Sequence, residues 1–169
     1  MTNFIDPDFT FAVLVFVFGA IVGSFLNVCI GRLPKDESIV HPPSHCPDCN
    51  AALSFYDNIP LISYLLLLGR CRSCRARISP RYFVVELLTA LLAVALYRQF
   101  GLGLAFCAGF IFVSALIVIS FIDLAVRIVP DVISLPGIIV GLVFSIVGAY
   151  VVNDPFELVP SPLSAFLGV

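Results

Sequence analysis

The sequence predicts an all-α polytopic membrane protein, with four transmembrane helices, the start of a fifth, and a long polar loop after the first helix. Of the 169 residues, 60% are hydrophobic and only 12% are charged. A soluble chain of this length has too little interior to bury so many apolar side chains. The apolar surface must therefore face lipid or other helices, and the composition excludes a disordered chain and a disulfide-rich secreted domain.

Each predicted helix depends on the length of its apolar run, because about 20 residues are needed to cross the hydrocarbon of a bilayer. Three runs contain no Asp, Glu, Lys or Arg and are long enough, namely 9–31, 99–122 and 132–153. A fourth run, 82–97, is short and contains Glu86. This run can cross the bilayer if the side chains of Arg81 and Arg98 extend to opposite membrane–water interfaces. Residues 163–169 begin another apolar run, which we interpret as the start of an unfinished fifth helix.

A shorter apolar run, 61–68, lies between Pro60 and Gly69 and cannot cross a bilayer. We expect it to pack on the membrane surface or under the loop. The predicted organisation has three parts: an outer N-terminus and first helix (1–31), a polar loop (32–81), and a helical region that bears Asp123 and is truncated (82–169).

The orientation follows from the basic residues, because seven of the nine lie between positions 32 and 81. Short cytoplasmic loops are enriched in Lys and Arg, so the polar loop is predicted to be cytoplasmic. By alternation the N-terminus lies outside and residues 123–131 lie inside. The first apolar run has no basic segment before it and no small-residue cleavage site, which predicts a retained helix and not a cleaved signal peptide.

Four cysteines in the polar loop are spaced as two pairs. Cys46-Pro-Asp-Cys49 and Cys71-Arg-Ser-Cys74 are separated by 21 residues. Two such pairs are typical of a structural zinc site, in which four thiolates surround one ion and leave no position for water. A reactive dithiol and a pair of disulfides are the alternatives, and a cytoplasmic location weighs against disulfides. The nearby His41 and His45 are possible substitute ligands, but four cysteines already complete a site.

A carboxylate at the end of the run 99–122 is a candidate functional residue. Asp123 lies at the edge of the hydrocarbon, where a charge is costly. An ordinary interfacial residue paired with Arg127, one helical turn later, fits the sequence equally well. Asp131 follows Pro130 and precedes the run 132–153, where a carboxylate caps a helix and meets its positive dipole end. We therefore predict that Asp131 is chiefly structural.

Other polar residues lie inside predicted helices. In the first helix, Gly19 and Gly23 form a small-x-x-x-small pair, and Ser24 and Asn27 continue that face. This pattern predicts close helix packing with an amide hydrogen bond across the interface. Glu86, near the start of the second helix, is expected either to pair with a loop arginine or to line a polar cavity.

Together these residues form a set that resembles a known family. The set comprises Gly23-Ser-Phe-Leu-Asn27, Arg32-Leu-Pro34, the two cysteine pairs, Asn58-Ile-Pro60, Arg81-Tyr82 through Glu86, and Asp123 with Pro130-Asp131. Along essentially its whole length the chain resembles the type IV prepilin peptidases. These are bifunctional enzymes of the bacterial inner membrane that serve type IV pili and type II secretion.

The resemblance implies an intramembrane aspartic endopeptidase that removes the basic leader of type IV prepilins and pseudopilins. It also implies methylation of the new N-terminal residue with S-adenosylmethionine. One catalytic aspartate of the family matches Asp123, and Asp131, Arg127, Glu86 and Asn27 are candidates for supporting roles. The bilayer and the prepilins are the expected partners, and no nucleic acid is expected.

The family's second catalytic aspartate belongs to a Gly-x-Gly-Asp motif, which this sequence lacks. Its only Gly-x-Gly, Gly101-Leu-Gly103, is followed by Leu104. The resemblance therefore implies roughly the N-terminal two-thirds of a typical member, inactive alone because one carboxylate cannot supply both acid and base. A non-catalytic adaptor or degenerate homologue that binds prepilins without cleaving them is the alternative. A membrane protein with a thiol redox function is a third hypothesis.

Overall fold

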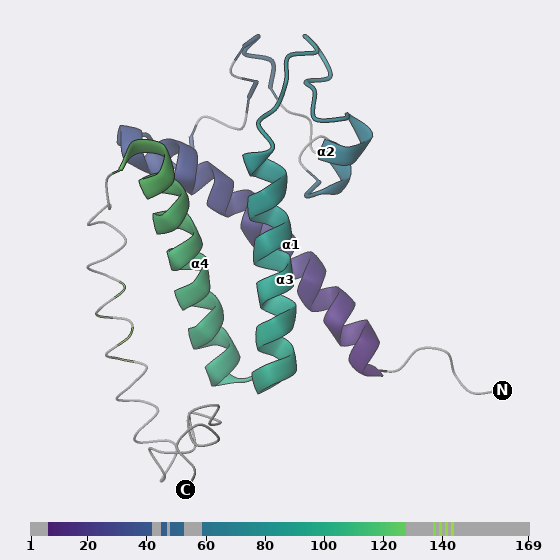
Figure 1. Ribbon diagram of the computed structural model, residues 1–169, viewed down its shortest axis with the longest axis vertical. Coiled ribbons are helices and arrows are strands. Elements are labelled where there is room, and N and C mark those ends of the chain that lie inside the picture. Colours follow the sequence, from purple (N-terminus) through teal and green to yellow (C-terminus); the bar gives the residue numbers. More distant parts are fainter. Residues whose placement is uncertain are drawn as a thin grey trace, which may run out of the picture. The chain divides into compact units, whose positions relative to one another are not determined.

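The computed structural model describes residues 7–41, 45, 46, 48–52 and 59–127, together with four positions between 137 and 143. The regular elements of this part are all helices: α1 (Pro7–Arg32), the 3₁₀ helix η1 (Leu33–Lys35), α2 (Ile62–Leu66), α3 (Arg81–Phe100) and α4 (Leu104–Val126) (Figure 1). Residues up to Pro130 form one compact unit. The second unit begins at Asp131, and its described positions Gly137, Ile139, Gly141 and Val143 are helical.

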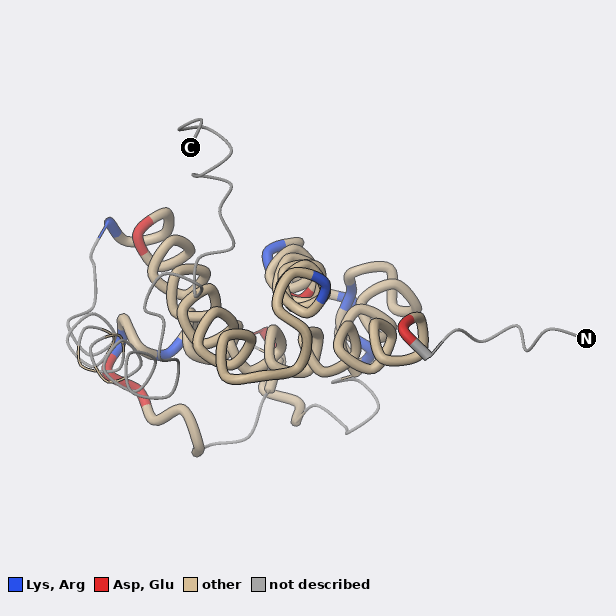
Figure 2. Tube along the Cα trace, turned by 90° about the horizontal axis from the view of Figure 1, so that it is seen from below, with Lys and Arg blue, Asp and Glu red and all other residues tan. Residues whose placement is uncertain are grey.

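Three helices are long and apolar enough to cross a membrane: Asp8–Lys35, Arg81–Phe100 and Leu104–Val126. Their coils carry almost no charged side chains, and the charged residues gather toward the helix ends and on the loop (Figure 2). The first three predicted spans are therefore confirmed as membrane-length helices. Most of the predicted span 132–153 and all of the predicted fifth helix, 163–169, lie outside the described residues.

The boundaries differ from the prediction where a glycine ends α3. Gly101 has φ 66°, a backbone conformation that glycine adopts without strain, and its N–H donates to the Tyr97 carbonyl at 2.8 Å. The helix therefore continues through Phe100, and α4 starts at Leu104 instead of residue 99. The other end of α4 also differs from the prediction: the helix runs to Val126, so Asp123 lies within its last turn and not after its end.

The closest helix contact is between α1 and α3. A Cβ atom at Gly19 would lie 2.8 Å from the Ala90 Cα, and one at Gly23 would lie 2.7 Å from the Glu86 Cα. The backbones can approach this closely only because both positions are glycine. One turn further along α1, the buried Asn27 side chain donates from Nδ2 to the Tyr82 carbonyl at 3.0 Å. Both the close packing and the amide hydrogen bond predicted for this face are confirmed.

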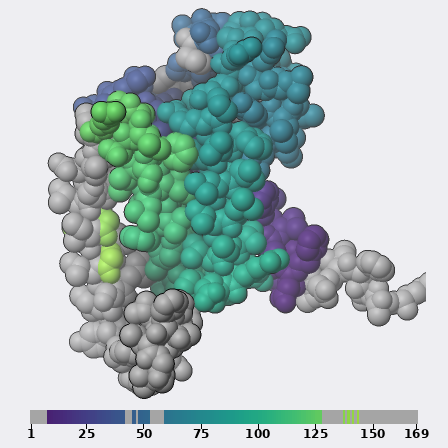
Figure 3. Space-filling view, viewed as in Figure 1, coloured from purple at the N-terminus to yellow at the C-terminus, as the bar shows by residue number. Residues whose placement is uncertain are grey.

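Helix α4 completes the bundle through aromatic side chains. Phe106 and Phe110 stack at 5.8 Å, and Phe110 also meets Phe18 of α1 at 5.5 Å. Val15 and Ala93 complete this buried cluster, which holds all three helices together. The space-filling view shows α3 and α4 side by side, with the polar loop above them (Figure 3). The bundle therefore presents the loop, the beginning of α3 and the end of α4 at one end.

Candidate functional site

The two cysteine pairs occupy turns of the same construction. In the first turn the Cys46 N–H donates to the Ala51 carbonyl at 2.9 Å, and the Asn50 N–H donates to the Cys46 carbonyl at 2.9 Å. The second turn repeats both bonds at the equivalent positions, from Cys71 N–H to Ala76 at 2.8 Å and from Arg75 N–H to Cys71 at 3.0 Å. A single antiparallel bridge closes each turn, joining His45 to Ala52 and Arg70 to Arg77.

The two turns bring all four sulfurs together. The Sγ atoms of Cys46, Cys49, Cys71 and Cys74 lie within 4.8 Å of one another, and those of Cys46 and Cys74 are 3.8 Å apart. Four sulfurs at about 2.3 Å from a tetrahedral zinc ion would be about 3.8 Å apart, so the cluster has the right size. All six cysteines of the chain are free thiols in this structure. Neither His41 nor His45 belongs to the cluster.

The electrostatics of the cluster explain why a cation fits it. The backbone N–H groups of Cys74 and Ser73 lower the pKa of Cys71 to about 7. The backbone N–H of Ala76 acts in the same direction on Cys74, but burial and the three neighbouring thiols outweigh it and raise the pKa of Cys74 to about 12. Once one cysteine of the cluster is a thiolate, its negative charge disfavours the ionisation of the neighbouring thiols. A divalent cation would remove this repulsion and allow all four sulfurs to bind as thiolates.

Glu86 connects the loop to the helices. Its buried carboxylate accepts a hydrogen bond at Oε2 from the Leu61 N–H at 2.8 Å, across 25 residues of sequence. Leu61 immediately precedes α2 and has φ 61°. Glu86 also lines the cavity described next, as one of the two expectations for it has it, although the lining of that cavity is more apolar than polar. The sequence contains no signal for the Leu61 contact, since a backbone N–H is common to nearly every residue.

A cavity of about 730 Å³ lies where the loop meets the helix ends. Cys46 and Cys71 of the loop line it, and so do side chains from α1, the start of α3, and Ala125 and Val126 at the end of α4. Two buried polar atoms of its lining residues, Oδ1 of Asn27 and Nε of Arg81, have no hydrogen-bond partner in the described part of the chain. These two atoms are themselves buried, so other atoms of Asn27 and Arg81 form the cavity wall.

Asp123 lies one turn from the end of α4, close in sequence to the cavity-lining Ala125 and Val126, and its side chain is exposed. Arg127 ends α4 with φ 55°, and its N–H donates to the Asp123 carbonyl at 2.8 Å. The described contacts of these two residues include no side-chain ion pair, so the structure does not form the pairing of Asp123 with Arg127 that was the alternative to a functional role. Asp131 lies outside the described residues.

The fold and this site define a class: a helical protein with three membrane-length helices, whose polar loop brings together four cysteines that could hold a metal ion. The chain matches the family model of the bacterial peptidase A24 N-terminal domain over residues 17–100. It also matches the model of the type IV leader peptidase family over residues 110–169. The chain therefore belongs to the type IV leader peptidase family, as the resemblance predicted.

Relatives from several bacteria agree with this assignment. A prepilin leader peptidase/N-methyltransferase of Myxococcus xanthus (strain DK1622) is 49% identical over 132 residues, which cover 78% of this chain and 39% of that protein. The protein of that name from Aeromonas hydrophila is 41% identical over 162 residues, covering 82% and 56%. A type 4 prepilin-like proteins leader peptide-processing enzyme of Escherichia coli O78:H11 (strain H10407 / ETEC) is 38% identical over 177 residues, covering 92% and 63%. The chain thus spans about half the length of these relatives. No solved structure matches it.

Proposed function

We propose that this chain is part of a prepilin leader peptidase that also methylates the new N-terminal residue of its product. The substrates would be type IV prepilins and pseudopilins. The protein would lie in the bacterial inner membrane with the cysteine loop in the cytoplasm. The family matches, the relatives' names, the three membrane-length helices and the basic loop support this proposal.

One observation carries the proposal: the cysteine loop and the end of α4 contribute to the same cavity. Ala125 and Val126, which follow Asp123 closely, line it together with Cys46 and Cys71. A leader peptide held by the loop would therefore reach the region of Asp123. Residues at the ends of three membrane-length helices line the cavity. A substrate could therefore keep its own apolar segment in the membrane while its leader enters the cavity.

Asp123 would act as one of two catalytic carboxylates. Two carboxylates that share a site have different pKa values, so one can donate a proton while the other, ionised, activates the attacking water. The partner would be the aspartate of a Gly-x-Gly-Asp segment, which these 169 residues do not contain. In this scheme Asp131 caps the following helix, Arg127 ends α4, and Asn27 and Glu86 shape the cavity from α1 and α3.

The four-cysteine cluster would hold one structural zinc ion, with Cys46, Cys49, Cys71 and Cys74 as its ligands. The matching size of the sulfur cluster and the repeated turn geometry support this assignment. S-adenosylmethionine would be the methyl donor.

The test requires a protein in which this chain is followed by a Gly-x-Gly-Asp segment. In that protein Asp123→Asn should abolish leader cleavage while the protein stays folded and metal-loaded, because an amide can neither ionise nor share a proton. The matched Asp131→Asn variant should keep most of its activity, since Asn caps helices well. Retained cleavage in the Asp123→Asn variant would refute the proposal. Binding of prepilin with no cleavage by the unsubstituted protein would favour the adaptor hypothesis.

A further inference from the structure

An apolar ridge lies on the outer side of the short helix α2. The ridge consists of Ile62, Leu65, Leu66 and Leu68, whose side chains are 56%, 59%, 78% and 84% exposed. The first three have the i, i+3, i+4 spacing that places them on one helix face. Exposed apolar side chains that are contiguous, and not scattered singly, indicate a surface that contacts something other than water.

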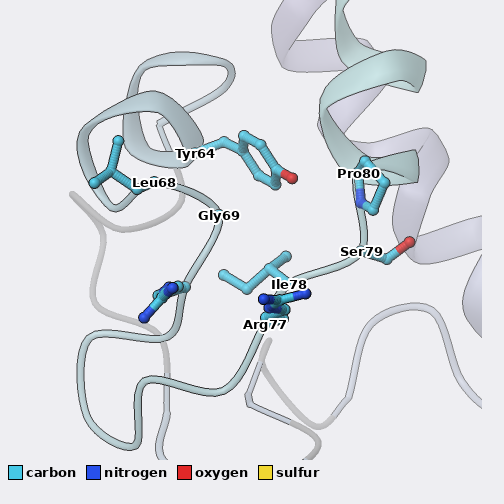
Figure 4. A pocket seen from close by; sticks show the side chains of 8 residues that line it. Tyr64, Leu68, Gly69, Arg77, Ile78, Ser79 and Pro80 are labelled. Carbon is cyan, nitrogen blue, oxygen red and sulfur yellow. The ribbon is translucent and has the colours of Figure 1, made fainter.

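The inner side of α2 is fixed to α3. The Tyr64 ring packs against Phe83 with 5.5 Å between ring centroids, and the Leu61 N–H binds the Glu86 carboxylate. Behind Tyr64, Gly69 has φ 64°, and a Cβ there would lie 2.8 Å from the tyrosine hydroxyl. Figure 4 shows the tyrosine ring on the α3 side of this segment and Leu68 on the opposite side. The exposure of the ridge is therefore set by contacts on the other face of α2.

These contacts place α2 at a definite depth. Phe83 and Glu86 lie in the first two turns of α3, which is 20 residues long. A helix of that length measures about 30 Å, the full thickness of the hydrocarbon, so its first two turns lie at the membrane boundary and not above it. Figure 1 shows α2 beside this end of α3, whereas the tips of the cysteine turns lie farther from the spans. The ridge is thus at the level where lipid surrounds the protein.

Two exposed arginines adjoin the ridge. Arg70 follows Leu68 by two residues and is bridged to Arg77, and both line a cavity of about 490 Å³ with Tyr64 and Leu68. Apolar side chains next to arginines are the combination that binds a membrane surface, with the former in the acyl boundary and the latter at anionic headgroups. A groove for a helical peptide or for a second copy of the chain could lie at any height on the protein. The contacts with α3 instead hold this ridge at the membrane boundary.

We propose that the ridge inserts into the interface of the surrounding bilayer and that Arg70 and Arg77 bind its anionic headgroups. The cysteine loop is then held against the membrane at α2 as well as at its two ends. The inference does not depend on the proposed proteolysis. It concerns only where α2 lies, and it selects the membrane surface from the two locations that the sequence allows for residues 61–68.

Tryptophan fluorescence provides the test, because the chain contains no tryptophan. Leu66→Trp and Leu65→Trp report on the ridge, and Ser73→Trp, at the exposed tip of the second cysteine turn, is the control. Each full chain is placed in vesicles of phosphatidylethanolamine and phosphatidylglycerol that contain a lipid brominated near the headgroup end of its acyl chain. Circular dichroism and metal content check that each variant is folded.

We expect blue-shifted emission and strong quenching by the brominated lipid for both ridge variants, and quenching by aqueous iodide for the control. Ridge tryptophans that iodide quenches as it does the control would overturn the inference. Protection from both quenchers would also overturn it, since a second copy or another protein segment would then cover the ridge. Adding Arg70→Gln and Arg77→Gln should weaken lipid quenching in these anionic vesicles and not in phosphatidylcholine. An equal effect in both would refute the role of the arginines.

Discussion

The contact between α1 and α3 and the four-cysteine loop are stabilised in opposite ways. The helices meet at Gly19 and Gly23, where backbone lies against backbone and the buried Asn27 adds a hydrogen bond. Lipid is as apolar as the helices, so close packing and not the hydrophobic effect holds them together. In the loop, Cys46 and Cys71 are buried while Cys49 and Cys74 are exposed, and the proposed metal ion would supply the stability that packing does not. A change in one region should therefore leave the other largely intact.

Removing the metal ligands should have the largest effect. Cys46→Ser with Cys71→Ser takes one sulfur from each turn, and zinc content should fall from about one ion per chain to none. Because binding of a structural zinc contributes on the order of 10 kcal/mol to folding of its site, the loop should become sensitive to protease. Elemental analysis and limited proteolysis measure the two effects.

The helices provide the control for this experiment. In the same variant the helical circular dichroism should be almost unchanged, since the α1–α3 contact needs no metal. Zinc that remained bound at one ion per chain would show that other residues hold it. Isolation of the unsubstituted protein without zinc and with both cysteine pairs oxidised would favour the redox hypothesis.

Enlarging a glycine in the helix contact is the converse change. A Gly23→Leu side chain would meet the backbone of Glu86, and we expect a loss of at least about 1–3 kcal/mol in the free energy of unfolding. Gly31→Leu is the matched control, because a Cβ at Gly31 has no atom within 4 Å. Unfolding of both variants in mixed detergent micelles measures the difference. Equal stabilities would contradict the close approach of α1 to α3.

Glu86 belongs to both regions, so its substitution tests how they are connected. Glu86→Ala leaves the Leu61 N–H without its acceptor, at a cost of about 1–3 kcal/mol. Glu86→Gln retains a side-chain oxygen that can accept the bond and should behave almost like the unsubstituted protein. Hydrogen exchange at the Leu61 amide should accelerate in the alanine variant alone. Equally fast exchange in all three proteins would show that α2 is not held by Glu86.

The smallest effect is expected at Asn27. Asn27→Ala removes the hydrogen bond to the Tyr82 carbonyl, and such bonds between membrane helices contribute about 0.6 kcal/mol. The loss should be visible in the same micelle unfolding assay, with zinc content unchanged. A loss as large as that of Gly23→Leu would mean that the hydrogen bond, and not the close packing, dominates this contact.

The two regions also differ in how far the sequence predicts them. The cysteine cluster follows from spacing, because each Cys-x-x-Cys pair forms its own turn. The glycine face of α1 is likewise predicted by its four-residue repeat. The partners of Asn27 and Glu86 are backbone groups 55 and 25 residues away, and such groups have no signature in a sequence. The end of α3 differs from the prediction for a similar reason, since the sequence does not show that Gly101 adopts a positive φ.

The central claim is that the cysteine loop and the Asp123 end of α4 face the same compartment, the cytoplasm. Labelling with a membrane-impermeant maleimide tests this most directly, in a chain whose Cys29 and Cys107 are replaced by Ala and with the labelling of the four loop cysteines in that parent chain subtracted. In intact cells we predict labelling of Asn3→Cys and no labelling of Ser38→Cys or Arg127→Cys, whereas inside-out vesicles should reverse the result. Labelling of Ser38→Cys and Arg127→Cys from outside the cell would invert the orientation. Labelling of only one of those two would contradict the shared site itself.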